Sequence, residues 1–235
     1  MDTASWTSSP NFETPAGRLL RELIRHLPKD RSFTITVFGS APIQIMVDPN
    51  LLSADVDVFS PAEDLAAFVE SAGLNREQTD FYLQVSSELN FRTSPQWRER
   101  ATTINSQNAI LVFPHPIDIL IAKLNRLDDK DLRAFEIVLA RTGHPTEAEL
   151  IHELQMAVDL FRPSFDEEQG YDIAANCRRL WPLIYGREID PRKEIIAPAL
   201  AKRKAGYGEP SQDHKQELRD ALRDAGGGLG SPGKG

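Results

Sequence analysis

The sequence predicts a protein of the mixed α/β (α+β) class, in which helices pack on a small mixed β-sheet and a helical region follows. Two observations predict this class. Up to residue 114, segments rich in β-branched and aromatic residues alternate with amphipathic helical segments. From residue 115 onward, apolar side chains recur almost only at helical spacing.

The composition is that of a globular protein, with 40% hydrophobic and 26% charged residues. No segment approaches the roughly 18 to 20 apolar residues of a membrane span, and residues 1–10 are polar, unlike a signal peptide. Cys177 is the single cysteine, which excludes an intrachain disulfide and fits a reducing compartment. We therefore expect a cytoplasmic protein with no membrane partner.

The formal net charge of −8 bears on possible partners. Sequence-independent binding to nucleic acid depends on a surplus of Lys and Arg that neutralises phosphates. We therefore expect no broad nucleic-acid binding, although a local basic groove is compatible with these totals.

Four segments are predicted from composition and periodicity. Residues 1–13 are rich in Ser and Thr and are expected to be flexible. Residues 14–114 form the predicted sheet domain, and residues 115–201 form a helical region packed on it. Residues 202–235 are charged and Gly-rich, which predicts a disordered tail.

The sheet domain begins with a helix and a strand. A Thr-Pro pair at 14–15 provides an N-cap and a favoured first helical residue, and leucines follow at helical spacing. Residues 33–38 read Phe-Thr-Ile-Thr-Val-Phe, which predicts a strand. A Gly-Ser corner at 39–40 ends the strand, and a short helix is expected over residues 41–47.

A second strand is predicted over residues 54–59. Asp55 and Asp57 lie on one face of this strand and two valines lie on the other. The residues that follow match the S/T-x-x-E pattern of a capping box, with Ser60 and Glu63, and predict the start of another helix.

Two further strands are expected at residues 81–86 and 109–113, and the polar stretch 90–107 between them is interpreted as an excursion at the sheet edge. Trp97 and the arginines beside it are suited to stacking on a base or gripping an acceptor strand. The alternative is that Trp97 anchors this loop on the core while Arg100 pairs with an acid.

Helix signals follow one another in the remaining chain. Pro116 begins a helix with an apolar stripe, and the acids at 128–129 end it and cap the next. Residues 143–145, Gly-His-Pro, end that helix. Residues 146–149 form a capping box for a third helix, and residues 172–185 suggest a fourth.

Asp55 and Asp57 are the strongest candidates for chemistry. Two carboxylates one residue apart on a strand point to the same side and can hold the same metal ions, and Mg²⁺ prefers oxygen ligands. The Gly39-Ser40 corner leaves backbone N–H groups open to a phosphate. Together these residues predict the handling of a nucleoside triphosphate with Mg²⁺. The alternative is that both carboxylates are solvated at the end of a half-exposed strand.

These motifs resemble the signature of the polymerase-β-like nucleotidyltransferase superfamily, in which a strand ends in Gly-Ser and a later strand carries Asp-x-Asp. They stand here as Val-Phe-Gly-Ser at 37–40 and Ser-Ala-Asp-Val-Asp-Val at 53–58. The resemblance covers residues 33–59 well. A looser resemblance through residues 97–100 and 118–131 extends to bacterial nucleotidyltransferase-like proteins related to abortive-infection and toxin–antitoxin toxins.

The resemblance implies a nucleotidyltransferase fold and a function. Gly39 and Ser40 would contact the triphosphate, and Asp55 and Asp57 would bind the catalytic Mg²⁺ ions. The implied reaction transfers a nucleoside monophosphate from an NTP to a hydroxyl group of a protein, an RNA or a small molecule.

The resemblance also implies roles for two later residues. Lys123 would neutralise phosphate, and Asp131 would orient the lysine or a ligand. The alternative is a solvated lysine and an acid that complements the dipole of its helix. Asp118 is expected to cap its own helix rather than to touch substrate.

Active relatives usually carry a third carboxylate on a later strand, as general base or orienter of the attacking hydroxyl. Residues 81–86 contain no acid, although Asp80 and Glu88 flank them. This departure supports a second hypothesis. In it the chain is a catalytically impaired relative, a nucleotide-binding or partner-binding module of the toxin–antitoxin type.

Overall fold

Five strands form one mixed sheet in the computed structural model, which describes residues 6, 9–76, 78–162 and 172–206. The strand order is β3-β2-β1-β5-β4. β1 pairs antiparallel with β2 and parallel with β5, β2 pairs parallel with β3, and β4 pairs antiparallel with β5. The strands are β1 (Phe33–Phe38), β2 (Asp55–Phe59), β3 (Tyr82–Val85), β4 (Thr102–Ser106) and β5 (Ala109–Phe113). The mixed α/β class is confirmed.

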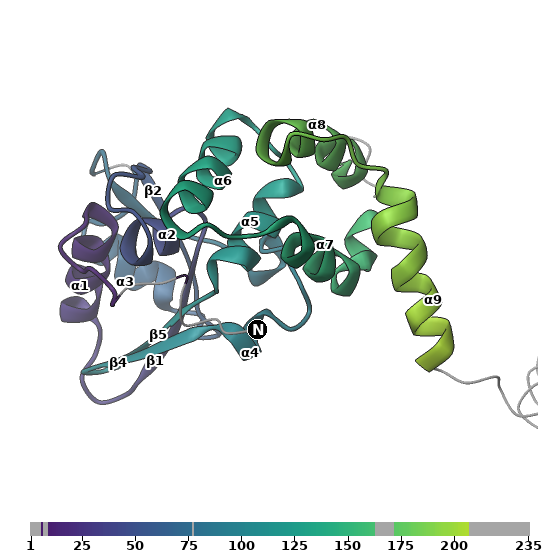
Figure 1. Cartoon of the computed structure of the whole chain (residues 1–235). Helices are drawn as coiled ribbons and strands as arrows, with labels where there is room; N and C mark the ends of the chain where they lie inside the picture. The colour runs from purple at the N-terminus through teal and green to yellow at the C-terminus, as the bar shows by residue number, and fades with distance from the viewer. Residues whose placement is uncertain (1–5, 7–8, 77, 163–171, 207–235) are drawn as a thin grey trace, which may run out of the picture.

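Helices flank this sheet (Figure 1). In the sheet domain they are α1 (Pro15–His26), α2 (Ala41–Met46), α3 (Leu65–Ser71) and α4 (Trp97–Arg100). The later helices are α5 (Pro116–Leu124), α6 (Asp129–Thr142), α7 (Glu147–Met156), α8 (Ile173–Tyr185) and α9 (Ala197–Gly206). Short 3-10 turns lie at Glu88–Asn90 and Val158–Phe161, and a π-helical turn at Arg192–Ile196 precedes α9.

Local capping explains where several helices begin and end. The Thr14 side chain accepts a hydrogen bond from the N–H of Gly17 at the start of α1. Reciprocal capping boxes begin α6, with Asp128 and Asp131, and α7, with residues 146–149. Gly143 ends α6 in the left-handed conformation, with φ of 72°. These starts and stops agree with the sequence prediction.

The start predicted for α3 was wrong. The Ser60 hydroxyl accepts a hydrogen bond from the N–H of Ala62 inside a turn, and α3 begins only at Leu65 with no side-chain cap. The segment 90–107 also differs from the expected loop, because it contains α4 and β4. Thr102–Ser106 is polar apart from one isoleucine, as is usual for an edge strand, and this hid its strand character.

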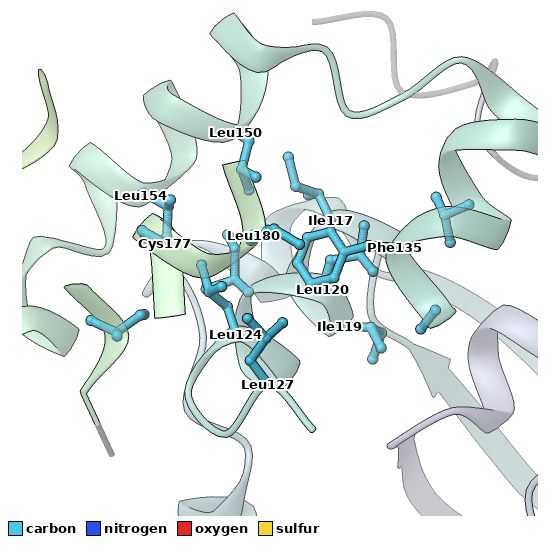
Figure 2. Packing of buried hydrophobic residues seen from close by; sticks show 14 of the residues in the cluster. Ile117, Ile119, Leu120, Leu124, Leu127, Phe135, Leu150, Leu154, Cys177 and Leu180 are labelled. Carbon is cyan, nitrogen blue, oxygen red and sulfur yellow. The ribbon is translucent and has the colours of Figure 1, made fainter. Parts of the chain in front are cut away.

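The two faces of the sheet pack against different helices. The first hydrophobic cluster lies between one face and the helices α1 to α3, and it includes Val56 and Val58 of β2. The second cluster joins Phe38 to helices α5, α6, α7 and α8. Figure 2 shows side chains of these four helices converging around α5. The sheet face that carries Asp55 and Asp57 is therefore turned toward the later helices.

Both ends of the described chain differ from the expected flexible segments. Trp6 is buried, and its ring lies 4.7 Å from each of the rings of His115 and His144. The N–H of Asn11 donates to the carbonyl of Ile45. α9 continues through residues 202–206, and residues 207–235 lie outside the described residues. Among the described residues, no helix is long and apolar enough to cross a membrane.

Candidate functional site

Asp55 and Asp57 lie side by side along one face of β2, and both are half-buried. The sheet register sets Asp57 opposite Phe38 of β1 and opposite Gln84 of β3. Asp57 is therefore at the centre of a three-strand surface, one residue away from the Gly39 corner.

Gly39 is required at this corner for two reasons. Its φ of 67° lies in the left-handed region that side chains disfavour, and a Cβ at this position would lie 2.5 Å from Oδ2 of Asp57. The strand end thus lies so close to the Asp-x-Asp strand that a larger residue at position 39 would force the Asp57 carboxylate to move.

The environment of the two carboxylates is polar, and within the described part of the chain no Lys or Arg forms a salt bridge with either of them. The Ser53 hydroxyl donates to Asp55 at 2.6 Å, and the Ser86 hydroxyl donates to Asp57 at 3.2 Å. Burial, and then the charge of Asp55, raise the pKa of Asp57 above its ordinary value. A divalent cation would relieve this repulsion, so the donor set fits Mg²⁺, which needs only one or two carboxylates besides phosphates and water.

Two cations, Lys123 and the largely exposed Arg126, lie near Asp57 and share one buried carboxylate. Lys123 Nζ lies 2.9 Å from Oδ1 of Asp131, and the Arg126 guanidinium donates two hydrogen bonds to the same carboxylate, at 3.0 and 3.1 Å. The Lys123 side chain is only 10% exposed and that of Asp131 is fully buried. Burial raises the pKa of Asp131, but Arg126 and Lys123 outweigh it and hold the pKa below its ordinary value. Lys123 is therefore not a solvated lysine.

Two cavities flank the carboxylate pair. The first has a volume of about 240 Å³ and brings together Gly39, Asp57, Lys123 and Asp131, beside the aromatic ring of Phe91. The second, about 780 Å³, is lined by Ser40 and Asp55 among others. We name them the Asp57 cavity and the Asp55 cavity. The six predicted site residues thus gather around two neighbouring cavities.

One comparison with known proteins decides the family. Residues 18–168 match the model of a family described as a nucleotidyltransferase of unknown function (DUF6036). The chain belongs to this nucleotidyltransferase family. No curated protein and no solved structure is significantly similar to it. The matched range contains every predicted site residue of this nucleotidyltransferase.

The acids considered for the third position are engaged elsewhere or lie apart in this family member. Glu88 pairs with Arg98, and Asp80 lines the Asp55 cavity. The position beside Asp57 on β3 is held by the neutral Gln84. Within the described residues, no group of three His, Cys, Asp or Glu side chains is arranged to hold a metal ion.

Trp97, considered for stacking on a base, and Asp118, expected to cap its own helix, both make structural contacts in this nucleotidyltransferase. Trp97 is buried in the second hydrophobic cluster, edge-on to Phe91, so it anchors its segment on the core. Asp118 does not cap α5, because the His115 side chain is the N-cap and accepts a hydrogen bond from the N–H of Ile117. The buried Asp118 carboxylate instead pairs with Arg100 at 2.6 Å, and Arg100 also contacts Glu153 at 3.0 Å.

Arg126 and Ser86 of the Asp57 cavity were not among the predicted residues. Arg126 lies in the turn between α5 and α6, three residues after Lys123 and five before Asp131, and this closeness in sequence is the one signal that pointed to it. Ser86 comes directly after β3, where only the parallel pairing of β3 with β2 brings it to Asp57. That pairing is not visible in the sequence.

Substituting Gly39 tests the contact with Asp57. We expect Gly39→Ala to destabilise the protein by about 1 to 2 kcal/mol through its left-handed backbone and by a further ~1 to 3 kcal/mol through crowding of the carboxylate. Gly143→Ala is the matched control, because Gly143 has a similar φ but nothing within 4 Å of a Cβ. Urea unfolding measures both; equal losses for the two variants would contradict the crowding.

Asp57→Asn tests the electrostatics of the pair. Because the pKa of Asp57 is raised on folding, its ionised form destabilises the folded state. We therefore expect Asp57→Asn to melt at a higher temperature than wild type at pH 7.5 without Mg²⁺. The advantage should shrink as the pH falls toward the ordinary pKa of aspartate, where both states are protonated.

Thermal melts with and without MgCl₂ complete this test. Mg²⁺ should raise the melting temperature of wild type and have little effect on Asp57→Asn, with NaCl of equal ionic strength as the control. A lower melting temperature for the variant at pH 7.5, or an equal response to Mg²⁺, would count against the assignment.

Proposed function

We propose that this nucleotidyltransferase carries out Mg²⁺-dependent transfer of a nucleoside monophosphate from an NTP to a hydroxyl group. One observation carries the proposal: the half-buried Asp55 and Asp57 share a strand face beside Gly39, and Lys123 lines the same cavity as Asp57. Membership of a nucleotidyltransferase family supports it.

In this reaction the acceptor hydroxyl oxygen bonds to the α-phosphorus of the NTP. The bond from that phosphorus to the oxygen bridging the β-phosphate breaks, pyrophosphate leaves, and the hydroxyl proton passes to a base. Asp55 and Asp57 would hold Mg²⁺, which supplies neutralisation of the phosphate charge. Their two carboxylates on one strand face, with a repulsion that a cation relieves, support this role.

Lys123 and Asp131 have complementary proposed roles. Lys123 would contact a phosphate oxygen, and Asp131 would position the ammonium group rather than take part in proton transfer. The 2.9 Å contact between them and the lowered pKa of Asp131 support this division, because an ionised, buried carboxylate fixes a lysine over one cavity wall. Gly39 and Ser40 would contact the triphosphate through their backbone N–H groups.

The finer classification is also a proposal. The Gly-Ser corner and the Asp-x-Asp strand support a place in the polymerase-β-like superfamily, and the looser resemblance over residues 118–131 supports one near nucleotidyltransferases of abortive-infection and toxin–antitoxin systems. The acceptor classes are a protein, an RNA or a small molecule, with the NTP as donor.

Replacing one carboxylate tests the proposed reaction. We expect Asp55→Asn to lower the transfer of label from α-³²P-NTPs, in the presence of Mg²⁺ and a cell extract, at least about 100-fold. The matched control is Asp30→Asn, an exposed acid in the loop before β1 that should keep wild-type transfer. Labelling by Asp55→Asn at the level of the control would overturn the assignment.

A second function is favoured by Gln84. An amide beside Asp57, where active relatives carry an acid, is expected of a catalytically impaired module that binds nucleotide or a partner protein without transfer. Under this alternative the Asp57 cavity still binds an NTP, and the chain acts through the bound complex.

Restoring an acid at this position separates the two functions. We expect Gln84→Asp to tighten Mg²⁺ binding, measured by isothermal titration calorimetry, because a third carboxylate adds an oxygen ligand beside Asp57. If wild type lacks transfer and Gln84→Asp acquires it, the impaired module is correct. Gln84→Asn controls for the shorter side chain, and unchanged Mg²⁺ affinity in Gln84→Asp would show that residue 84 does not face the metal.

A further inference from the structure

The Asp55 cavity is the larger of the two cavities beside the carboxylate pair, and its lining is unlike the rest of an acidic protein. The chain has a formal net charge of −8, yet in this one cavity of about 780 Å³ three cations, Arg76, Lys130 and Arg133, outnumber the two acids, Asp55 and Asp80. Polar groups of Ser40 and Ser53 complete the wall nearest the carboxylate.

Helix α6 divides the two cavities. Asp131, in its first turn, lines the Asp57 cavity and holds Lys123 there. Lys130 and Arg133, three residues apart and hence on a common helix side, line the Asp55 cavity. The start of α6 thus places cations beside both carboxylates. Lys130 and Arg133 line the Asp55 cavity themselves, and Asp131 holds Lys123 in the Asp57 cavity.

The cations of the Asp55 cavity are available to a ligand, because within the described residues they form no salt bridges. Among the described residues, no salt bridge joins Lys130 or Arg133 to an acid, whereas Arg126 one turn earlier is bound to Asp131. The Arg76 guanidinium lies 5.6 Å from the centre of the Tyr82 ring, which orients it along the wall. A single exposed cation is ordinary, but three around one cavity next to a carboxylate pair indicate an anionic ligand.

We propose that the Asp55 cavity is a phosphate-binding subsite, separate from the phosphate contact of Lys123. This inference rests on the proposed function. In nucleotidyl transfer the attacking oxygen and the leaving pyrophosphate lie on opposite sides of the α-phosphorus. With the nucleoside monophosphate in the Asp57 cavity, the Asp55 cavity takes one of two phosphate-bearing groups: the β- and γ-phosphates of the donor, or a phosphate of an anionic acceptor.

Charge-neutralising variants test the subsite by binding alone. Arg133→Gln and Lys130→Gln are exposed substitutions, and Arg179→Gln, on the exposed side of α8 and outside both cavities, is the matched control. The probes are inorganic pyrophosphate, a non-hydrolysable ATP analogue, AMP and a short 5′-phosphorylated oligoribonucleotide, each titrated calorimetrically with Mg²⁺. Thermal melts verify that the variants remain folded.

Each pattern of results has a meaning. We expect each cavity variant to weaken pyrophosphate and the ATP analogue about tenfold and to leave AMP unchanged, which assigns the donor phosphates. Weakening confined to the oligoribonucleotide assigns a phosphate of the acceptor and equally supports the subsite.

The subsite is overturned if both variants bind every probe as Arg179→Gln does, or if wild type binds none. Because these titrations involve no transfer, they remain distinct from the labelling test. Loss of labelling in Asp55→Asn with unchanged binding in Arg133→Gln would keep the proposed function and reject the subsite. The reverse pattern would keep the subsite and reject the transfer.

Discussion

The burial of helix α5 on all sides is the constraint on which the candidate site depends. Every residue from Pro116 to Ile121 is buried, and Leu124 with them, so this helix has no free face. A helix that is buried around its circumference is stable only inside a core, and here the second hydrophobic cluster joins α5 to Phe38 of the sheet and to α6, α7 and α8 (Figure 2). Lys123, near its C-terminal end, is thereby fixed beside the Asp57 cavity.

Ion pairs between different helices hold the charged groups that are buried around α5. Arg100, the last residue of the unpredicted helix α4, donates hydrogen bonds to Asp118 of α5 and forms an ion pair with Glu153 of α7. Asn125 and Asn176 extend the same principle without charge: the Asn176 amide donates to the carbonyls of Leu124 and Asn125 where α5 ends. Removing one partner from such a network leaves a buried group unsatisfied, so these residues hold α5 in register as well as in place.

Much of the fold was predictable because its signals are local. The Thr-Pro start of α1, the capping boxes of α6 and α7 and the left-handed Gly143 need only neighbours in sequence. Strand β4 was missed because an edge strand needs few apolar side chains, and the burial of Trp6 depends on rings more than 100 residues away in sequence. In the site, Gly39 and Asp57 could be predicted from their motifs. The positions of Ser86 and Gln84 beside Asp57 depend on the pairing of β3 with β2, which no local sequence pattern indicates.

The geometry also limits which group accepts a proton in the proposed reaction. Asp131 is held ionised by Lys123 and Arg126, and the N–H of Asp128 donates to it as well, so its oxygens are already occupied. Glu88 is drawn to Arg98, away from the cavity lining, and Gln84 carries no charge. Of the carboxylates in the Asp57 cavity, Asp57 alone has a raised pKa, and a cation bound there would lower it. In the proposed reaction, the acceptor proton would therefore pass to water or to a substrate phosphate, and catalysis would depend on positioning and charge neutralisation rather than on a protein base.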